Sequence, residues 1–386
     1  MAVQLASDEQ MLIDMVRDLA REKVAPRAAE IDAKGEFPWD MKELLAQQDI
    51  FAMPFPEEYG GLGSSELSIL MVIEELAKAC ATTSLLLCVQ QLGSLPILLA
   101  GNDEQKQRFL PKLASGEWLA SYALTEPGSG SDAGAMRTRA VKRGDSYVLN
   151  GLKHFITNAG VAHINTVFAV TGNEGTRSIS AFVVEGDRPG FHMGKVENKM
   201  GIRGSQTGEL VFEDCEIPAE NLLGKEGEGF KIALATLDRT RPGIAAQALG
   251  IAQGALDFAV KYARERVQFG KPIWDNQAIQ FMLADMDIQV EAARQLIYHV
   301  GELMDAGVAR FGRESAIAKT FASDAAISVT NDAIQVLGGY GYMKEFPVER
   351  MMRDAKITQI YEGTNQIQRM VIARAGGAEV RGTKQY

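Results

Sequence analysis

The apolar positions along the chain change their spacing twice, near residues 121 and 229. Over residues 1–120 they recur every three or four positions, which is the period of one helix face. The segment 7–19 shows this pattern behind a serine and two acidic residues, a typical helix start. Further helices are predicted over 65–78 and 103–113, so this part of the chain is predicted to be helical.

Beyond residue 121, apolar runs are short and glycine is frequent. Four runs predict β-strands, at 146–151, 164–170, 178–186 and 208–217. Polar pieces that contain glycine, at 142–147 and 172–178, predict hairpin turns between strands. The whole stretch is about 100 residues long, an ordinary domain size, and predicts a β-domain.

After residue 229 the helical spacing returns. Between 277 and 305, apolar residues fall at steps of four and three, at positions 279, 283, 286, 290, 293, 297, 300 and 304. Such spacing is typical of the face on which a helix packs in a bundle. Two more helices are predicted, over 315–337 and 364–375. The chain is therefore predicted to be helical, then β, then helical again.

Composition and charge exclude several classes of protein. The 386 residues are 46% hydrophobic and 23% charged, as in ordinary soluble globular proteins, which excludes disorder over most of the chain. The net charge of −10 excludes the basic footprint of a nucleic-acid-binding protein, although a local basic patch can still hold a phosphorylated ligand. Three cysteines and four histidines show neither a disulfide framework nor metal-ligand spacing. The chain shows no signal peptide or long apolar span, so we expect a cytoplasmic protein without a metal or a transmembrane segment.

Two segments of the predicted β-domain carry groups suited to a ligand. In 122–134, YALTEPGSGSDAG, a strand runs into a glycine-rich turn with many hydroxyls, which brings backbone N–H groups near a phosphate or a flat ring. A plain connecting loop fits the same residues. Its GSGSDA piece matches a dinucleotide fingerprint, but the residues that follow predict strands rather than a helix, so a Rossmann unit is excluded. In 153–158, KHFITN, an aromatic ring beside hydroxyl and amide groups fits one face of a flavin-sized ring or the core of a strand.

Three segments of the second helical part also carry candidate chemistry. Segment 238–242, DRTRP, has two arginines that can reach phosphates through their donor forks, or can lie on a solvated helix face. RVQFG at 266–270 is soon followed by an Asn-Gln pair. QVLGGYGY at 335–342 ends a helix with glycines that allow close approach of a ligand or simply cap the helix.

Glu362 is the candidate for acid–base chemistry. It lies between Tyr361 and Gly363, just before a helix predicted to be capped by Thr364. A carboxylate held against apolar neighbours has a raised pKa and can take a proton from a weak carbon acid. A glutamate before a glycine is more often a residue of a surface loop.

Together these segments resemble the acyl-CoA dehydrogenase family of flavoenzymes over essentially the whole chain. Three long patterns, in the family's order and spacing, carry the resemblance: ALTEPGSGSDAGA at 123–135, QVLGGYGYMKEFPVERMMRD at 335–354 and IYEGTNQIQR at 360–369. Short- and medium-chain members are the most similar, through LPILLAGNDEQKQ, RTRP, ERVQFGK and AKITQIYEGT.

The resemblance implies an α+β multi-domain fold. A helical N-terminal domain would span 1–120, a barrel-like or sandwich β-domain 121–228, and a four-helix bundle 229–386. FAD would lie between the β-domain and the bundle, and its adenine end would reach a neighbouring subunit of a homotetramer.

The resemblance also implies an activity, the α,β-dehydrogenation of a short- to medium-chain acyl-CoA thioester to the trans-2-enoyl-CoA in fatty acid β-oxidation. Glu362 would take the α-proton, and a hydride would pass from the β-carbon to flavin N5. The thioester oxygen would accept hydrogen bonds from the backbone N–H of Glu362 and from a ribityl hydroxyl, which stabilise the developing negative charge. Electrons would then pass to electron-transferring flavoprotein.

Site residues follow from the same resemblance. Those expected around FAD are Tyr122, Leu124, Thr125, Ser131, Phe155, Ile156, Thr157, Arg266, Gln268, Phe269, Gln277, Gln335, Gly338, Gly339, Thr364 and Gln366. Those expected to contact the acyl-CoA are Ser131, Asp238, Thr240, Arg241, Tyr361 and Gly363. Some long- and branched-chain members place the base near position 240, where this chain has Thr240, and this leaves Glu362 as the base.

Other functions stay open at this point. They are a dehydrogenase for a branched or alicyclic acyl-CoA, a flavin oxidase, and a catalytically silent protein that binds flavin or acyl-CoA. A nicotinamide dehydrogenase would need a strand–glycine–helix unit that the sequence does not show. Residues 86–96 lie where relatives shape the acyl pocket, but pocket depth depends on packing.

Overall fold

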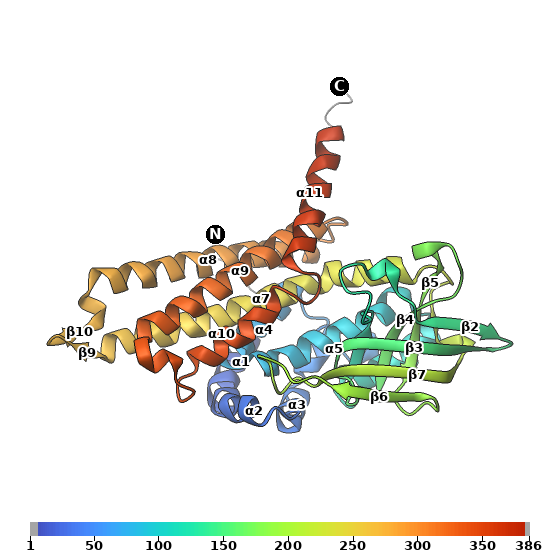
Figure 1. The fold of residues 1–386 in the computed structure, drawn as a ribbon, viewed down its shortest axis with the longest axis horizontal. Coiled ribbons are helices and arrows are strands. Elements are labelled where there is room, and N and C mark those ends of the chain that lie inside the picture. Colours follow the sequence, from blue (N-terminus) through green and yellow to red (C-terminus); the bar gives the residue numbers. More distant parts are fainter. Residues whose placement is uncertain (1–6, 383–386) are drawn as a thin grey trace.

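The computed structural model describes residues 7–382 and shows helices and a β-sheet arranged along one long axis (Figure 1). Residues 1–6 and 383–386, at the two ends of the predicted domains, lie outside the described residues. A helical part comes first, a sheet occupies one end, and long helices extend to the other end (Figure 1). The predicted three-part α, β, α fold is confirmed.

The first part contains six α-helices among the described residues: α1 (Ser7–Leu19), α2 (Ala28–Lys34), α3 (Trp39–Gln47), α4 (Glu66–Ala79), α5 (Ala81–Ala100) and α6 (Asp103–Ala114). The helices predicted at 7–19, 65–78 and 103–113 are confirmed. Local capping explains two of these starts, since the Ser65 side chain accepts from the N–H of Ser68, and Asn102 forms a capping box with Gln105. Helix α5 had no clear pattern because it is buried on nearly every side and therefore lacks a polar stripe.

The middle part is an eight-stranded sheet, with strands β1 (Ala120–Ala123), β2 (Arg139–Arg143), β3 (Ser146–Thr157), β4 (Ile164–Val170), β5 (Ile179–Glu185), β6 (Phe191–Val196), β7 (Thr207–Pro218) and β8 (Leu222–Leu223). The order is β6-β7-β3-β2-β4-β5-β8, and β1 pairs with β4 in parallel. The four strands predicted from apolar runs are confirmed. Strand β6 was missed because its side chains are mostly exposed and form no apolar run.

The last part contains α7 (Gly229–Glu265), α8 (Gln277–Asp305), α9 (Gly312–Leu337), α10 (Val348–Thr358) and α11 (Asn365–Gly382), with a small hairpin of β9 (Val267–Gln268) and β10 (Lys271–Pro272). Helices α7, α8 and α9 lie side by side, and α4 packs against α7 and α8 (Figure 1). The residues predicted to form the packing face of α8 are largely buried, namely Leu283, Met286, Val290, Ala293, Ile297 and Val300.

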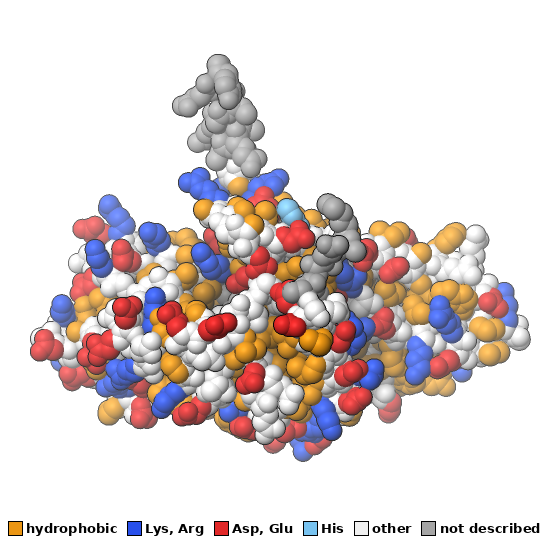
Figure 2. Space-filling view, turned by 180° about the vertical axis from the view of Figure 1, so that it is seen from behind, with side chains coloured by type: hydrophobic (Ala, Val, Ile, Leu, Met, Phe, Trp, Pro, Cys, Tyr) orange, Lys and Arg blue, Asp and Glu red, His pale blue; other side chains and the backbone are white. Residues whose placement is uncertain are grey.

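Within residues 7–382, two helices, α5 and α7, are long and apolar enough to cross a membrane by length and composition alone. Their most apolar windows are 72% and 78% buried inside the protein, as in core helices. The surface carries charges of both signs with apolar patches between them (Figure 2), and α11 stands away from the body of the molecule (Figure 1). The β9–β10 hairpin lies at the end of the long helices opposite the sheet (Figure 1).

Candidate active site

Glu362 lies in the turn between α10 and α11, where several helices meet. Its Oε2 accepts a hydrogen bond of 2.7 Å from the hydroxyl of Thr240 on α7. Its backbone carbonyl accepts from Arg241 Nε at 3.3 Å and from Gln368 Nε2 at 3.0 Å. The backbone is left-handed at both Glu362 (φ 50°) and Gly363 (φ 90°), a sharp turn that these bonds hold in place. Glu362 is therefore fixed at the junction of α7, α10 and α11 rather than lying in a free surface loop.

The surroundings of Glu362 change its acidity. Burial raises the pKa of Glu362 to about 7, while the Thr240 hydroxyl and the charges of Arg241 and Lys319 oppose that rise. The residue nevertheless keeps a small part of its surface open. A carboxylate that is desolvated but reachable, with a pKa near neutrality, suits a general base.

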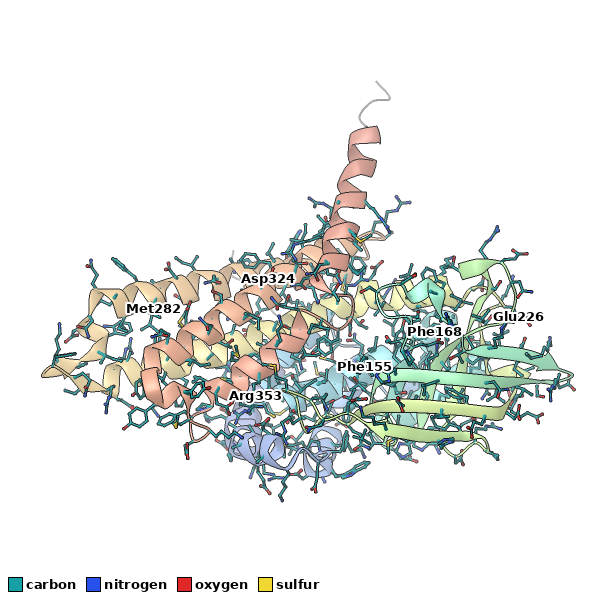
Figure 3. All side chains as sticks on the ribbon, in the orientation of Figure 1. Phe155, Phe168, Glu226, Met282, Asp324 and Arg353 are labelled. Atoms are coloured by element: carbon teal, nitrogen blue, oxygen red, sulfur yellow. The ribbon has the colours of Figure 1, made fainter. Side chains whose placement is uncertain are left out.

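The start of the glycine-rich loop, just after β1, lies alongside β3. The register between β3 and β7 shifts between Lys153 and Ile156, so this short stretch is a β-bulge. The bulge frees the N–H of His154 to donate to the carbonyl of Thr125 at 2.8 Å. It also turns Phe155 outward with φ 58° and 61% of its surface exposed, at the end of β3 nearest the long helices (Figure 3). Two segments predicted to bind flavin therefore share one surface.

Tyr122 links this surface to Glu362. Its hydroxyl donates to the carbonyl of Ala233 on α7 at 3.2 Å. Burial raises the pKa of Tyr122, and the nearby Glu362 carboxylate raises it further. Tyr122 and the predicted base Glu362 thus meet α7 at positions two turns apart on one face, so the start of the glycine-rich segment and the base lie at one site.

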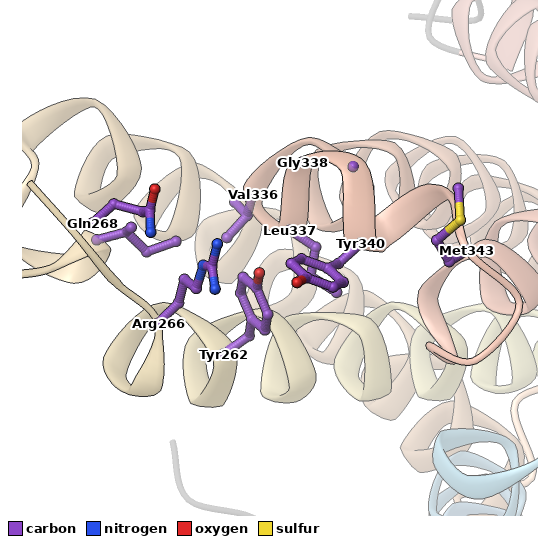
Figure 4. A pocket seen from close by; sticks show the side chains of 10 residues that line it. Tyr262, Arg266, Gln268, Val336, Leu337, Gly338, Tyr340 and Met343 are labelled. Carbon is purple, nitrogen blue, oxygen red and sulfur yellow. The ribbon is translucent and has the colours of Figure 1, made fainter.

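Other predicted cofactor residues lie far from Glu362, at the opposite end of the long helices. Arg266, Gln268, Gly338 and Gly339 line a cavity of about 430 Å³ together with Tyr262 and Tyr340 (Figure 4). Gln335 lies on the last turn of α9 beside this cavity, and Gln277 begins α8. Phe269, at the tip of the β9–β10 hairpin, is 98% exposed with φ 53°. One chain therefore does not bring all the predicted cofactor residues together.

The remaining predicted residues surround Glu362 or the base of α11. Arg241 is buried, and it pairs with Asp238. Ser131 is exposed on the glycine-rich loop. Thr364 and Gln366 line a polar cavity of about 480 Å³. The predicted cap is confirmed, since Thr364 Oγ1 accepts from the N–H of Ile367 at 3.3 Å. Leu124 directly follows β1, and Ile156 and Thr157 end β3. The roles of all these residues stay predictions.

Sequence reasoning missed several buried polar residues around the site. Lys153 is fully buried, and its ammonium donates to Glu126 at 2.8 Å and to the carbonyl of Leu124 at 3.1 Å. Gln247 and Lys319 are also fully buried, on α7 and α9. A lysine in an otherwise apolar helix face was a usable signal at Lys319, but the Lys153–Glu126 pair could not be found without the strand register.

The residues present fit a flavin cofactor. Phe155 offers an uncovered aromatic ring, and Arg266 offers a guanidinium for a pyrophosphate. An added Cβ at Gly128, Gly130, Gly338 or Gly339 would meet no atom within 4 Å, so these backbones are open to a bound group. Among the described residues, no cluster of three His, Cys, Asp or Glu side chains is suited to a metal.

Comparison with known proteins identifies the family. Models of the acyl-CoA dehydrogenase N-terminal, middle and C-terminal domains match residues 6–117, 121–215 and 227–377. The chain belongs to the acyl-CoA dehydrogenase family, and it is an oxidoreductase with FAD as its cofactor.

Its relatives include an enzyme named only as an acyl-CoA dehydrogenase and one named for a ring substrate. An acyl-CoA dehydrogenase of Bacillus subtilis is 50% identical over 96% of this chain and 98% of its own. A cyclohex-1-ene-1-carbonyl-CoA dehydrogenase of Geobacter metallireducens is 51% identical, again over 96% of this chain and 98% of its own.

Solved structures agree closely with this fold. Butyryl-CoA dehydrogenase from Megasphaera elsdenii is 48% identical with a TM-score of 0.94, and covers 98% of this chain and 100% of its own. A chain from a study of the electron transferring flavoprotein of Acidaminococcus fermentans is 50% identical with a TM-score of 0.95, over 97% and 99%. An acyl-CoA dehydrogenase from Bacillus anthracis, complexed with FAD, is 34% identical with a TM-score of 0.92, over 99% of this chain and 69% of that one.

Proposed function

We propose that this chain dehydrogenates short-chain, straight acyl-CoA thioesters between the α- and β-carbons, with Glu362 as the base. The desolvated Glu362 carboxylate, held by Thr240 beside the exposed flavin-type surface of the β-domain, is the observation that carries the proposal. A butyryl-CoA dehydrogenase among the structural neighbours supports the substrate class.

The chain's own groups account for proton removal. Glu362 takes the α-proton, and Thr240 keeps the receiving oxygen in place. Across residues 7–382 the backbone N–H of Glu362 has no protein acceptor, so it is free to donate to the thioester oxygen. That bond stabilises the negative charge that develops on the oxygen as the proton leaves. FAD, when bound, supplies the acceptor for the hydride from the β-carbon.

Gln247 limits the length of the acyl chain. Its Nε2 donates to the carbonyl of Ala81 at 2.9 Å and to Ser84 Oγ at 3.1 Å, and its Oε1 accepts from the hydroxyl of Tyr361. Gln247 lies seven residues from Thr240 on α7, which is two turns or about 10 Å along the same face. These hydrogen bonds form a buried polar bridge from Tyr361 through Gln247 to α5. An acyl tail that runs inward from Glu362 along α7 therefore meets this bridge, and breaking it would leave its polar groups unpaired.

Replacing Gln247 with Ala is expected to shift the preference toward longer substrates. The ratio of kcat/KM for octanoyl-CoA to that for butyryl-CoA should rise about tenfold, the effect of burying about two of the four additional methylenes at about 0.8 kcal/mol each. Steady-state kinetics with both substrates measure this ratio, and Gln280→Ala on the exposed side of α8 is the control. An unchanged ratio would remove Gln247 as the limit on chain length.

In this proposal, two copies of the chain together form one cofactor site, within the homotetramer that the family resemblance implies. Arg266 follows the end of α7 beside the β9–β10 hairpin, at the end of the long helices opposite the sheet, whereas Phe155 lies at the sheet (Figures 1 and 3), so one FAD would contact one surface from each of two copies. The fully exposed Phe269 belongs to the first of these surfaces.

Replacing Arg266 with Ala is therefore expected to weaken FAD binding about tenfold or more, since a charge-assisted hydrogen bond contributes about 1.5–3 kcal/mol. Flavin content after gel filtration and titration of the apoprotein with FAD measure the loss. Arg264→Ala is the matched control, because the Arg264 guanidinium lies over the Trp274 ring instead. Full flavin content in Arg266→Ala would contradict the two-copy site.

The functional test is the anaerobic bleaching of the bound flavin by a panel of acyl-CoAs. Butyryl-CoA should bleach it fastest, ahead of octanoyl-, isobutyryl- and cyclohexanecarbonyl-CoA. Fastest bleaching by a branched or ring substrate would establish the alternative that the Geobacter relative suggests. No bleaching by any member would indicate a silent binding protein, and peroxide formation in air would indicate an oxidase.

Electron-transferring flavoprotein is proposed as the electron acceptor, in keeping with the Acidaminococcus structure, and the cytoplasm as the location. Reoxidation of the bleached enzyme by that flavoprotein, faster than by oxygen, tests the acceptor.

A further inference from the structure

Lys319 is a buried cation directly behind the base. It lies on α9, is fully buried, and its Nζ donates to the carbonyl of Gly363 at 2.9 Å and to Oδ1 of Asn365 at 2.9 Å. Both acceptors belong to the turn that follows Glu362. Lysine is rarely fully buried unless it is paired, and within the described residues Lys319 forms no ion pair within 4 Å of a carboxylate. The position of this ammonium therefore needs an explanation.

The hydrogen bonds that Lys319 donates do not by themselves require its positive charge. The carbonyl of Gly363 also accepts from Gln368 Nε2 at 3.0 Å. Oδ1 of Asn365 also accepts from Ser323 Oγ at 3.2 Å. The Gly363 carbonyl thus keeps a donor without Lys319. The single hydroxyl proton of Ser323 also has the carbonyl of Lys319 as an acceptor, at 2.7 Å, so Oδ1 of Asn365 needs a second donor, but a neutral one would serve. Burial of an ammonium costs free energy. The positive charge itself is the feature that a neutral side chain could not replace.

The charged groups around Lys319 come from three elements. On α7, Arg241 is paired with Asp238. On α9, Asp324 already accepts from Gln359, Asn365 and Arg369. In the turn after α10, Glu362 has a hydroxyl and no cation in contact with its carboxylate oxygens. Glu362 is thus the carboxylate on which the charge of Lys319 has the most effect.

We propose that Lys319 is a positioning residue of the reaction: its buried ammonium fixes the turn at Gly363 and Asn365 and keeps the Glu362 carboxylate ionised until it takes the α-proton. This inference rests on the proposed role of Glu362 as base. Burial raises the pKa of Glu362, and the charge of Lys319 opposes that rise together with the Thr240 hydroxyl and the charge of Arg241, both of which have larger effects. Burial also lowers the pKa of Lys319 to about 7, against the effect of Glu362, so the assistance is greatest at and below neutral pH.

The test compares Lys319→Met with two other variants. Lys319→Arg keeps the charge, and Lys23→Met removes an exposed lysine in the N-terminal helical part. In the wild type, butyryl-CoA should reduce the flavin faster as the pH rises through about 7, because Glu362 ionises there. Lys319→Met should move that midpoint upward by about one pH unit, as expected for loss of a nearby opposite charge. Lys319→Arg should restore it, and Lys23→Met should leave it unchanged.

A second measurement reports on the carboxyl directly. The infrared carbonyl band of protonated Glu362, identified by its absence in Glu362→Gln, is titrated without substrate, and its midpoint should move upward in Lys319→Met. A slower reaction with neither midpoint moved would overturn the proposal and leave Lys319 a structural residue. If Glu362→Gln still reacts, the proposed base fails, but the infrared midpoint still decides whether Lys319 acts on Glu362. If Lys319→Met does not fold, Lys319→Gln keeps a donor without the charge and carries the same test.

Discussion

Replacing Glu362 with Gln is expected to lower the rate of anaerobic flavin reduction by butyryl-CoA by about 10²–10⁴-fold, the usual contribution of a general base. Glutamine has the same shape, and its side-chain carbonyl can still accept from the Thr240 hydroxyl. The turn and the flavin content should therefore survive while the proton acceptor is lost. Stopped-flow absorbance at saturating substrate measures the effect, with flavin content and thermal unfolding measured alongside.

Glu66→Gln is the matched control for this variant. Burial also raises the pKa of Glu66 to about 7, and nearby Asp305 raises it further. Glu66 begins α4 and contacts Gln91 rather than the turn at Gly363. Its replacement should leave flavin reduction within a few fold of the wild type. A Glu362→Gln enzyme that reduces flavin as fast as Glu66→Gln would reject Glu362 as the base.

The helices and strands that the sequence predicted well are those with one buried face. Helix α8 has apolar positions every three or four residues along its whole length, and both of its ends were predicted. Helix α5 is buried on nearly every side and β6 is mostly exposed, so neither has the contrast between faces that a pattern requires. Their identity depends on packing against other parts of the chain.

Sequence motifs identified the base but not its supporting residues. Glu362 was found through its neighbours in the chain and the family resemblance, and the structure adds Thr240 in direct contact with it. The ammonium of Lys319 and the bridge at Gln247 depend on contacts between residues 44 and 114 positions apart. Such contacts follow only from the assembled helices.

The buried pair of Glu126 and Lys153 should be costly to break, because removing one partner leaves the other charge buried and unpaired. Glu126 accepts from the Lys153 ammonium at 2.8 Å and from the N–H groups of Arg137 and Thr138 at 2.6 and 2.9 Å. Burial alone would raise the pKa of Glu126, but the Lys153 charge and these donors together lower it. The part of the stabilisation that depends on an ionised Glu126 is therefore complete above about pH 4.5, the ordinary pKa, and is lost as the pH falls through the lowered pKa. Burial also lowers the pKa of Lys153, to about 8, so the charged pair exists only below about that pH.

Replacing Glu126 with Ala is expected to lower the free energy of unfolding by about 3–5 kcal/mol, because it leaves the buried Lys153 ammonium without its counter-charge. Urea unfolding followed by fluorescence measures the loss, and Glu220→Ala, which breaks the exposed pair with Arg108, should cost about 1 kcal/mol or less. The double variant Glu126→Ala, Lys153→Met should be more stable than Glu126→Ala, since no unpaired charge remains. A double variant less stable than Glu126→Ala would mean that the cost arises from lost packing.

The same pair also affects the predicted cofactor surface, because Lys153 donates to the carbonyl of Leu124, next to Thr125. The Glu126→Ala variant should therefore retain less FAD than the wild type, even under conditions where it is folded.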